Sequence, residues 1–227
     1  MLGWNPGTEQ ELFTLEELTA AFSLERVIKS GARFNADKAK WYNKEYLRTK
    51  SAEELATLYI PVLESHGLQI VDCPACALTA GSAMNVAGAD FENRIFSRQY
   101  VERVVALIQE RATFVADFWD IASYLFVAPT EFVEKDAAKF WKEENYSLAL
   151  QAADFILNFD GEFTKTVLEG PLEEYIRGNE WPMGKVMNCL RLALVGASSG
   201  LGIADIVTLI GKDEFAKRIE YIKSKLC

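Results

Sequence analysis

The sequence has little histidine and little cysteine. Its 227 residues include one histidine, His66, and four cysteines. Cys73 and Cys76 form a single CxxC pair, whereas Cys189 and Cys227 stand alone. A structural zinc site usually needs a second pair of Cys or His ligands, and a redox CxxC needs a βαβ context that is missing here. We therefore expect no bound metal and reduced thiols that are mostly buried.

Long apolar runs and an N-terminal targeting signal are missing as well. No stretch of about 20 apolar residues occurs, so we expect no membrane span. The first residues have neither the basic region nor the apolar core of a signal peptide. These absences predict a cytoplasmic protein. Half of the residues are apolar, which is enough for one large core or two small ones.

The chain is acidic, and its excess of negative charge lies in the middle. The formal net charge is −9. Residues 1–50 carry +1, residues 51–183 carry −13 and residues 184–227 carry +3. This distribution argues against non-specific binding to nucleic acid, so we expect no DNA partner. It permits local contacts to a polyanion near both ends of the chain.

Alternating strand patterns are absent, and apolar residues recur at helical spacing along nearly the whole chain. Residues 14–17 and 51–54 are capping boxes, in which Thr14 with Glu17, and Ser51 with Glu54, satisfy free N–H groups at a helix start. The sequence therefore predicts an all-α fold.

Further helix boundaries follow from caps, glycines and prolines. Ser23 is expected to cap a helix through Ile28 that stops at Gly31, and Thr113 to begin one that ends at Pro129. Pro171 suits a first helical position, so two helices are expected around it. The later helices are expected near 131–142, 147–158, 162–169, 171–177, 183–195, 203–210 and 213–226.

The string RLALVGASSGLGIADIV at residues 191–207 is similar to the dinucleotide-binding loop of short-chain dehydrogenases. Tyr221 and Lys225 have the spacing of that family's catalytic pair. A dinucleotide site, however, needs a βαβ unit of about 30 residues with further parallel strands beside it. Only 25 residues follow Gly202. An NAD-dependent oxidoreductase is therefore a remote alternative, and we interpret the loop as a glycine-rich turn between two helices.

Two long segments resemble bacterial glutamyl-tRNA synthetase. LGWNPGTEQELFTLEEL and FSLERVIKSGARFNADKAKWYNKEYL are similar to the region just downstream of that family's catalytic domain. GKVMNCLRLALVGASSGLGIADIVTLIGKDEFAKRI is similar to its last anticodon-binding segment. The middle matches weakly, through ERATFVADF, and residues 130–180 do not align by eye. Cys189 and Val195 depart from the usual proline and threonine, and Ala39 from a common leucine.

The resemblance implies a C-terminal part of a class I synthetase. No KMSKS-type motif occurs, and His66 lacks the context of a HIGH-type motif, so no catalytic residue is expected and the chain alone should be inactive. The full-length enzyme would attach glutamate to tRNA-Glu with ATP and Mg²⁺, and the chain itself needs no cofactor. We expect a monomer with a stem-contact region at 1–60 and two helical anticodon-binding subdomains at 61–135 and 136–227.

The resemblance also implies which residues contact tRNA. Unstacked bases are recognised by arginine forks and by backbone groups that no Cβ shields. The implied anticodon-binding residues are Arg111, which would favour cytosine at the third position, and Arg191, Gly200, Leu201, Gly202 and Ile203. The implied stem contacts are Arg33, Lys38, Lys40 and Asn43. Positive charge beside the turn comes from Lys185, Lys212, Lys217 and Arg218, each of which can contact tRNA phosphate or simply be solvated.

Each of these assignments has a structural alternative. Arg111 can instead pair with Glu110 or Asp117, Arg191 can be an ordinary helical arginine, and Ile203 can belong to the core. For the whole chain, a stand-alone helical adaptor for protein partners is the main alternative. The acidic middle and the aromatic side chains Trp119, Trp141 and Trp181 favour it.

Overall fold

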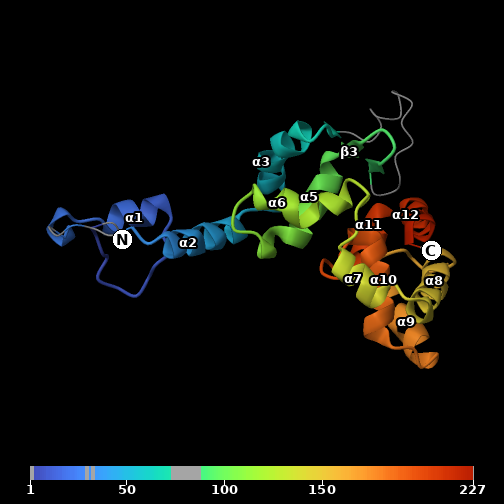
Figure 1. Cartoon of the computed structure of the whole chain (residues 1–227). Helices are drawn as coiled ribbons and strands as arrows, with labels where there is room; N and C mark the ends of the chain where they lie inside the picture. Colours follow the sequence, from blue (N-terminus) through green and yellow to red (C-terminus); the bar gives the residue numbers. More distant parts are fainter. Residues whose placement is uncertain (1–2, 29–30, 32–33, 73–87, 227) are drawn as a thin grey trace.

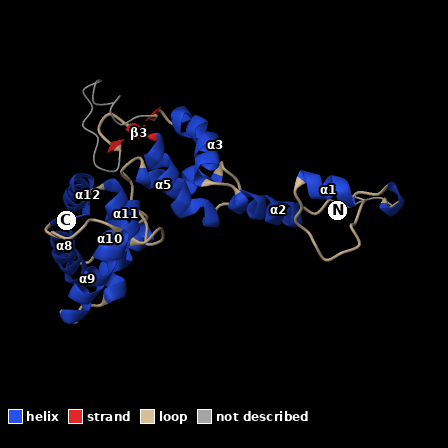
Figure 2. Cartoon of the chain, turned by 180° about the vertical axis from the view of Figure 1, so that it is seen from behind, coloured by secondary structure: helices blue, strands red, loops and turns tan. Residues whose placement is uncertain are grey.

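The computed structural model describes residues 3–28, 31, 34–72 and 88–226. An N-terminal arm leads into two helical bodies that lie side by side (Figure 1). Helices dominate both bodies, and the only strands among the described residues form one small sheet (Figure 2). The predicted all-α class is therefore confirmed apart from this sheet. Within the described ranges, every helix is too short or too polar to cross a membrane.

The N-terminal arm contains two helices that together bury one side chain, Leu47. Helix α1 (Leu15–Ala21) begins at the predicted Thr14 capping box, and helix α2 (Ala36–Thr49) is capped by Asn35. The predicted helix after Ser23 is wrong: Leu24–Arg26 is a single 3₁₀ turn, and Ser23 makes no side-chain cap. No side chain of this turn is buried, so packing does not support a longer helix there.

The first helical body combines helices with the small sheet. Helix α3 packs on α5 and on strand β1, and β3 pairs parallel with β1 and antiparallel with β2. The sequence did not predict these strands, because runs of two or three residues are too short to display alternation. The elements are α3 (Ala52–Ser65), β1 (Gln69–Val71), β2 (Ala89–Asp90), β3 (Ile95–Ser97), α5 (Arg98–Ile108), η2 (Gln109–Arg111), α6 (Asp117–Ala122) and η3 (Ser123–Leu125).

The second helical body is built around α10, which contacts each of the other helices in it. Its elements are α7 (Glu134–Phe140), α8 (Glu143–Leu157), α9 (Lys165–Gly178), α10 (Met183–Val195), α11 (Ile203–Ile210) and α12 (Lys212–Leu226). The bounds of α10 and α11 agree with the predicted ones. The predicted break at Pro171 is wrong, because α9 continues through it. Leu168, Leu172 and Ile176 form one buried stripe across the proline, and their burial outweighs the lost backbone hydrogen bond.

The buried side chain of Arg218 ties the two helical bodies together. Arg218 of α12 donates from Nε to Glu214 at 2.7 Å, and both side chains are almost fully buried. Its Nη1 donates to the carbonyls of Tyr124 in η3, at 2.6 Å, and Leu194 in α10, at 3.1 Å. The hypothesis that Arg218 contacts phosphate is therefore wrong, because only 2% of the residue is exposed.

The predicted division at residues 60 and 135 falls inside helices. Residue 60 lies in α3 and residue 135 lies in α7. The three-part division stays a prediction. Cys73 and Cys76 lie outside the described residues, so the prediction that they hold no metal also remains untested.

Candidate nucleic-acid interface

The glycine-rich segment forms a turn between α10 and α11. Gly196 ends α10 with a φ of +83°, and a Cβ there would lie 2.7 Å from the carbonyl oxygen of Glu131. A larger residue would meet both the strained backbone angle and this contact. A helix therefore precedes the glycines, where a dinucleotide fold needs a strand, and the dehydrogenase hypothesis is wrong.

Two predicted arginines from distant parts of the sequence meet at this turn. Arg111 Nη1 donates to the carbonyl of Gly200 at 3.1 Å, across 89 residues of sequence. Arg191 donates from Nε to the carbonyl of Leu201 and from Nη1 to that of Ser198, both at 3.4 Å. The structure thus places both guanidinium groups against one backbone segment.

The positive charges of the two arginines act on each other and on Tyr124. Burial lowers the pKa of Arg191 below its ordinary value, and the charge of Arg111 acts in the same direction. Burial raises the pKa of Tyr124, while both arginines oppose that rise. Tyr124 therefore stays protonated at neutral pH, beside a locally cationic surface that would attract an anion.

The turn itself offers backbone groups rather than side chains. Leu201 and Ile203 are each only 3% exposed, so their side chains belong to the core. Gly200 is exposed, and Gly202 is the N-cap residue of α11. A Cβ on Gly202 would lie 2.8 Å from Oδ2 of Asp205. Any contact from Leu201 or Ile203 to a base must therefore come mainly from the main chain.

The two carboxylates that could have paired with Arg111 have other partners. Glu110 lies 3.5 Å from Nη2 of Arg48. Asp117 accepts the backbone N–H groups of Thr113 and Phe114, each at 2.9 Å. Arg111 is exposed, and its described hydrogen bond goes to the turn. Its remaining N–H groups make no hydrogen bond with the described residues and can meet a ligand.

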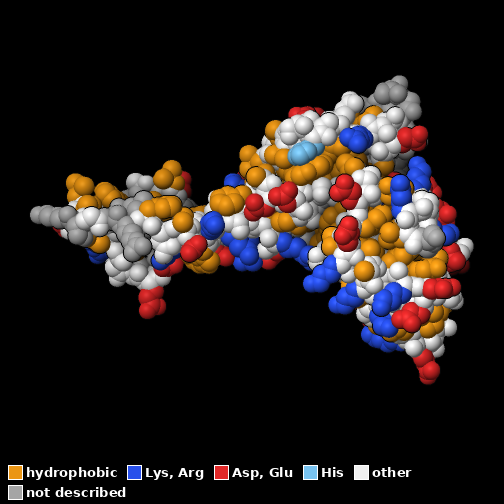
Figure 3. All heavy atoms as spheres, viewed as in Figure 1, with side chains coloured by type: hydrophobic (Ala, Val, Ile, Leu, Met, Phe, Trp, Pro, Cys, Tyr) orange, Lys and Arg blue, Asp and Glu red, His pale blue; other side chains and the backbone are white. Residues whose placement is uncertain are grey.

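The predicted stem-contact residues are spread along the arm and α2. Lys38 lies 2.5 Å from Glu11, Lys40 is exposed and Asn43 donates to the carbonyl of Thr113. The Asn43 contact brings the middle of α2 close to the segment that carries Arg111. Arg33 lies outside the described residues. Figure 3 shows Lys and Arg side chains gathered along one edge, from the arm to the second helical body.

Two further predicted contacts lie in the second body and already have partners. Lys185 lies 3.6 Å from Glu144. Lys212 donates to the carbonyl of Phe159 and lies over the ring of Phe163, 5.1 Å from its centroid. Neither contact joins the turn that holds Arg111 and Arg191. These two lysines therefore are not part of the cluster around Gly200.

The sequence did not mark three side chains that hold the turn or the helix after it, namely Tyr124, Asp136 and Lys165. Tyr124 accepts the N–H of Leu201 at 3.2 Å, and Asp136 accepts the N–H of Ser198 at 2.7 Å. The Ser198 hydrogen bonds lower the pKa of Asp136. Lys165 of α9 lies 3.0 Å from Asp205 of α11. No local pattern marks these side chains, because their partners lie 40 or more residues away.

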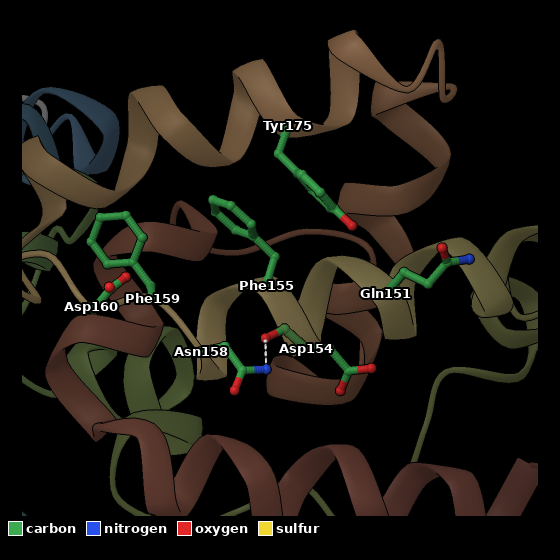
Figure 4. A pocket seen from close by; sticks show the side chains of 7 residues that line it. All are labelled: Gln151, Asp154, Phe155, Asn158, Phe159, Asp160 and Tyr175. Carbon is green, nitrogen blue, oxygen red and sulfur yellow. Dashed lines mark hydrogen bonds between the residues drawn. The ribbon is translucent and has the colours of Figure 1, made fainter.

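A separate pocket of about 350 Å³ lies between α8 and α9. Figure 4 shows a row of aromatic rings along it, in which Phe155 stacks on Tyr175 with centroids 4.5 Å apart. None of the predicted site residues lines this pocket, whose walls are Gln151, Asp154, Phe155, Asn158, Phe159, Asp160 and Tyr175.

The tryptophans that suggested a protein adaptor are engaged within the chain. Trp119 stacks on His66 with centroids 3.8 Å apart, and Trp141 is buried against Tyr146. Trp181 meets Tyr175 edge to face. Their contacts are therefore explained by folding alone, and they do not form a free aromatic surface.

The fold is a helical module whose glycine-rich turn carries exposed backbone beside two arginines. A family model described as an anticodon binding domain matches residues 54–223, and the chain belongs to that family. Among curated proteins, the chain is 40% identical to a glutamate–tRNA ligase of Flavobacterium psychrophilum and 37% identical to one of Parabacteroides distasonis. Each alignment covers 97% of this chain and 38% of the relative.

Solved structures of similar fold come from the same group of proteins as these relatives. A glutamate tRNA ligase of Elizabethkingia meningosepticum, in complex with its amino acid, superposes with a TM-score of 0.81 at 30% identity, over all of this chain and 40% of that one. A glutamate–tRNA synthetase of Elizabethkingia anophelis gives a TM-score of 0.77 at 29% identity, over 98% of this chain and 39% of that one. The chain spans about two fifths of the length of these proteins.

Proposed function

We propose that this chain is the anticodon-recognising part of a glutamate–tRNA ligase and that it binds tRNA-Glu through the turn between α10 and α11. One observation supports this most strongly: Arg111 and Arg191, which the family resemblance singled out, both donate to carbonyls of the same exposed turn. The membership in the anticodon-binding family and the similarity to glutamate–tRNA ligases support the same function.

The chemistry of the turn suits an unstacked base. Bases in single-stranded loops are read by hydrogen bonds to their edges and by flat surfaces that stack on them. An arginine fork aimed at a cytosine meets two acceptors, O2 and N3, whereas guanine presents N–H donors on that edge and repels the fork. Arg111 is the residue that we propose for discrimination at the third anticodon position, and Arg191 and residues 200–203 for the neighbouring bases.

The arm and the second body would hold the tRNA backbone. Lys40 is exposed and needs no rearrangement to reach a phosphate. Lys38 and Lys185 would exchange a carboxylate partner for a phosphate, which is inexpensive at an exposed site. Asn43 and Lys212 have protein partners and contribute less. Arg33 completes the proposed set.

The longer ligase would attach glutamate to its tRNA with ATP and Mg²⁺, in the cytoplasm. These ligands would be bound outside the present residues, whose described part contains no group of His, Cys, Asp or Glu side chains that fits a metal. The arm supports a longer protein, because Leu15, Leu24 and Phe34 are 64–79% exposed. Apolar side chains exposed to this degree suit a contact with another domain.

A filter-binding comparison tests the proposal. The wild-type chain should bind a tRNA-Glu transcript more tightly than one with guanine at the third anticodon position. One good bidentate contact contributes about 1–3 kcal/mol, which is about five- to 150-fold in Kd. Arg111→Gln should lose most of this preference, because glutamine can both donate and accept.

Arg177→Gln is the matched control, since Arg177 is an exposed arginine whose ion pair is with Glu173 of the same helix, α9, and not with the turn. It should keep the full preference. Equal binding of both transcripts by the wild-type chain would refute anticodon recognition. Loss of the preference in both variants would show that Arg111 has no special role.

A further inference from the structure

Tyr124 connects three parts of the molecule that are distant in sequence. It lies in η3 of the first helical body and is 8% exposed. Its hydroxyl oxygen accepts the N–H of Leu201 in the glycine-rich turn, at 3.2 Å. Its backbone carbonyl accepts Nη1 of the buried Arg218, at 2.6 Å. One residue thus links the first body both to the turn and to α12.

The hydroxyl of Tyr124 also lies beside the groups that face the proposed ligand. A Cβ built on Gly200 would lie 3.5 Å from this oxygen, an ordinary van der Waals distance, so the hydroxyl lies directly beside Gly200. The carbonyl of Gly200 accepts from Arg111, and the carbonyl of Leu201 accepts from Arg191. The phenol therefore holds the main chain at the point where the two arginines converge.

Anchoring matters here because the turn contains glycine. Glycine loses more conformational freedom on ordering than any other residue, so an unanchored turn would sample many backbone shapes. Two side chains oppose this freedom from two directions: Asp136 holds the N–H of Ser198, and Tyr124 holds the N–H of Leu201. The exposed residues 199 and 200 lie between these two anchors.

We propose that Tyr124 is a positioning residue for anticodon recognition: its hydroxyl fixes the backbone at Gly200 and Leu201 before the ligand arrives. This inference rests on the proposed function of the turn. A preorganised turn binds more tightly because less ordering occurs on association. Tyr124 needs no contact with the tRNA to have this effect.

Tyr124→Phe removes the hydroxyl and retains the ring. Tyr100→Phe is a matched control, since the fully buried Tyr100 donates its hydroxyl to the carbonyl of Leu125, at 2.6 Å, in the same 3₁₀ turn. Both variants lose one phenol–backbone hydrogen bond, and only the first lies at the glycine-rich turn. Both need a thermal unfolding curve, which reports the folded fraction at the assay temperature.

Amide hydrogen exchange of the free chain provides the first measurement. Exchange of the Leu201 N–H should be faster in Tyr124→Phe and unchanged in Tyr100→Phe. Unchanged exchange at Leu201 in Tyr124→Phe would overturn the positioning role, whatever the protein binds.

The second measurement compares the binding of tRNA-Glu with the binding of the anticodon-swapped transcript. Tyr124→Phe should bind tRNA-Glu about three- to tenfold more weakly, the effect of one hydrogen bond, and bind the swapped transcript as the wild type does. Tyr100→Phe should keep the wild-type ratio. A full anticodon preference in Tyr124→Phe, or an equal loss on both transcripts, would overturn the inference alone. A wild-type chain with no anticodon preference would instead overturn the proposed function.

Discussion

The same local signal opens one helix in the arm and one in the first helical body, with different results. Thr14 and Ser51 each form a complete capping box with the glutamate three residues later. The first box begins α1, which has seven residues and no buried side chain. The second begins α3, which has 14 residues and buries Leu55, Ala56, Tyr59 and Leu63. The hydrogen bonds of a cap are local, whereas the length and stability of the helix depend on packing.

The arm and the helical bodies also differ in burial along their whole length. Leu47 is the first buried residue of the described chain, and the core extends from there through both helical bodies. The arm exposes large apolar side chains instead. We infer that the helical bodies fold as one cooperative unit and that the arm lies outside this unit.

The largest effect is expected from a charge that becomes unpaired inside the core. Glu214→Ala leaves Arg218, whose side chain is 1% exposed, without its carboxylate. Breaking a buried pair in this way costs about 3–5 kcal/mol of unfolding free energy. Urea unfolding followed by circular dichroism measures this loss.

The arm supplies the control for this variant. Glu11→Ala removes the partner of Lys38, an ion pair whose two side chains are more than two fifths exposed. It should leave the urea midpoint unchanged. A Glu214→Ala variant as stable as Glu11→Ala would show that the two regions do not differ in the way described above.

A smaller effect is expected from the two caps. Ser51→Ala should reduce the free energy of unfolding by about 0.5–2 kcal/mol, because α3 is part of the cooperative core. Thr14→Ala removes an equivalent cap but should leave the main unfolding transition in place, with a small loss of helical signal only. Similar shifts of the melting temperature in both variants would place α1 inside the cooperative unit.

The smallest effect is the dependence of two stabilising contacts on pH, which has opposite signs in the two regions. Hydrogen bonds from Ser198 lower the pKa of Asp136 below its ordinary 3.8. The contribution of Asp136 is therefore present above that value and lost as the pH falls through the lowered pKa. Glu11 raises the pKa of Lys38 above its ordinary 10.5, so that contact is present below 10.5 and lost as the pH rises through the raised pKa.

NMR spectra follow both events. The Ser198 amide resonance should shift at acid pH and stay fixed in Asp136→Asn, while the side-chain resonances of Lys38 should shift at alkaline pH. A Ser198 shift that persists in Asp136→Asn would assign the acid transition to another group.

The sequence predicted the elements that depend on local rules. The bounds of α10 and α11 agree with the structure, because their apolar period is regular and glycine ends each helix. It failed where burial outweighed the local signal, as in α9, which continues through Pro171, and where too few residues carried a pattern, as in the small sheet.

The residues of the candidate site also fall into those that the sequence predicted and those that only the structure revealed. The arginines and the glycines were recognisable by their similarity to a known family, residue by residue. Tyr124, Asp136 and the buried role of Arg218 were not, since the hydrogen bonds that join these side chains to other elements span 24 to 94 residues. Caps and helical periods are interactions between near neighbours, so the sequence by itself determined them. Which side chains hold the turn is decided by how distant helices pack, and only the tertiary structure reveals it.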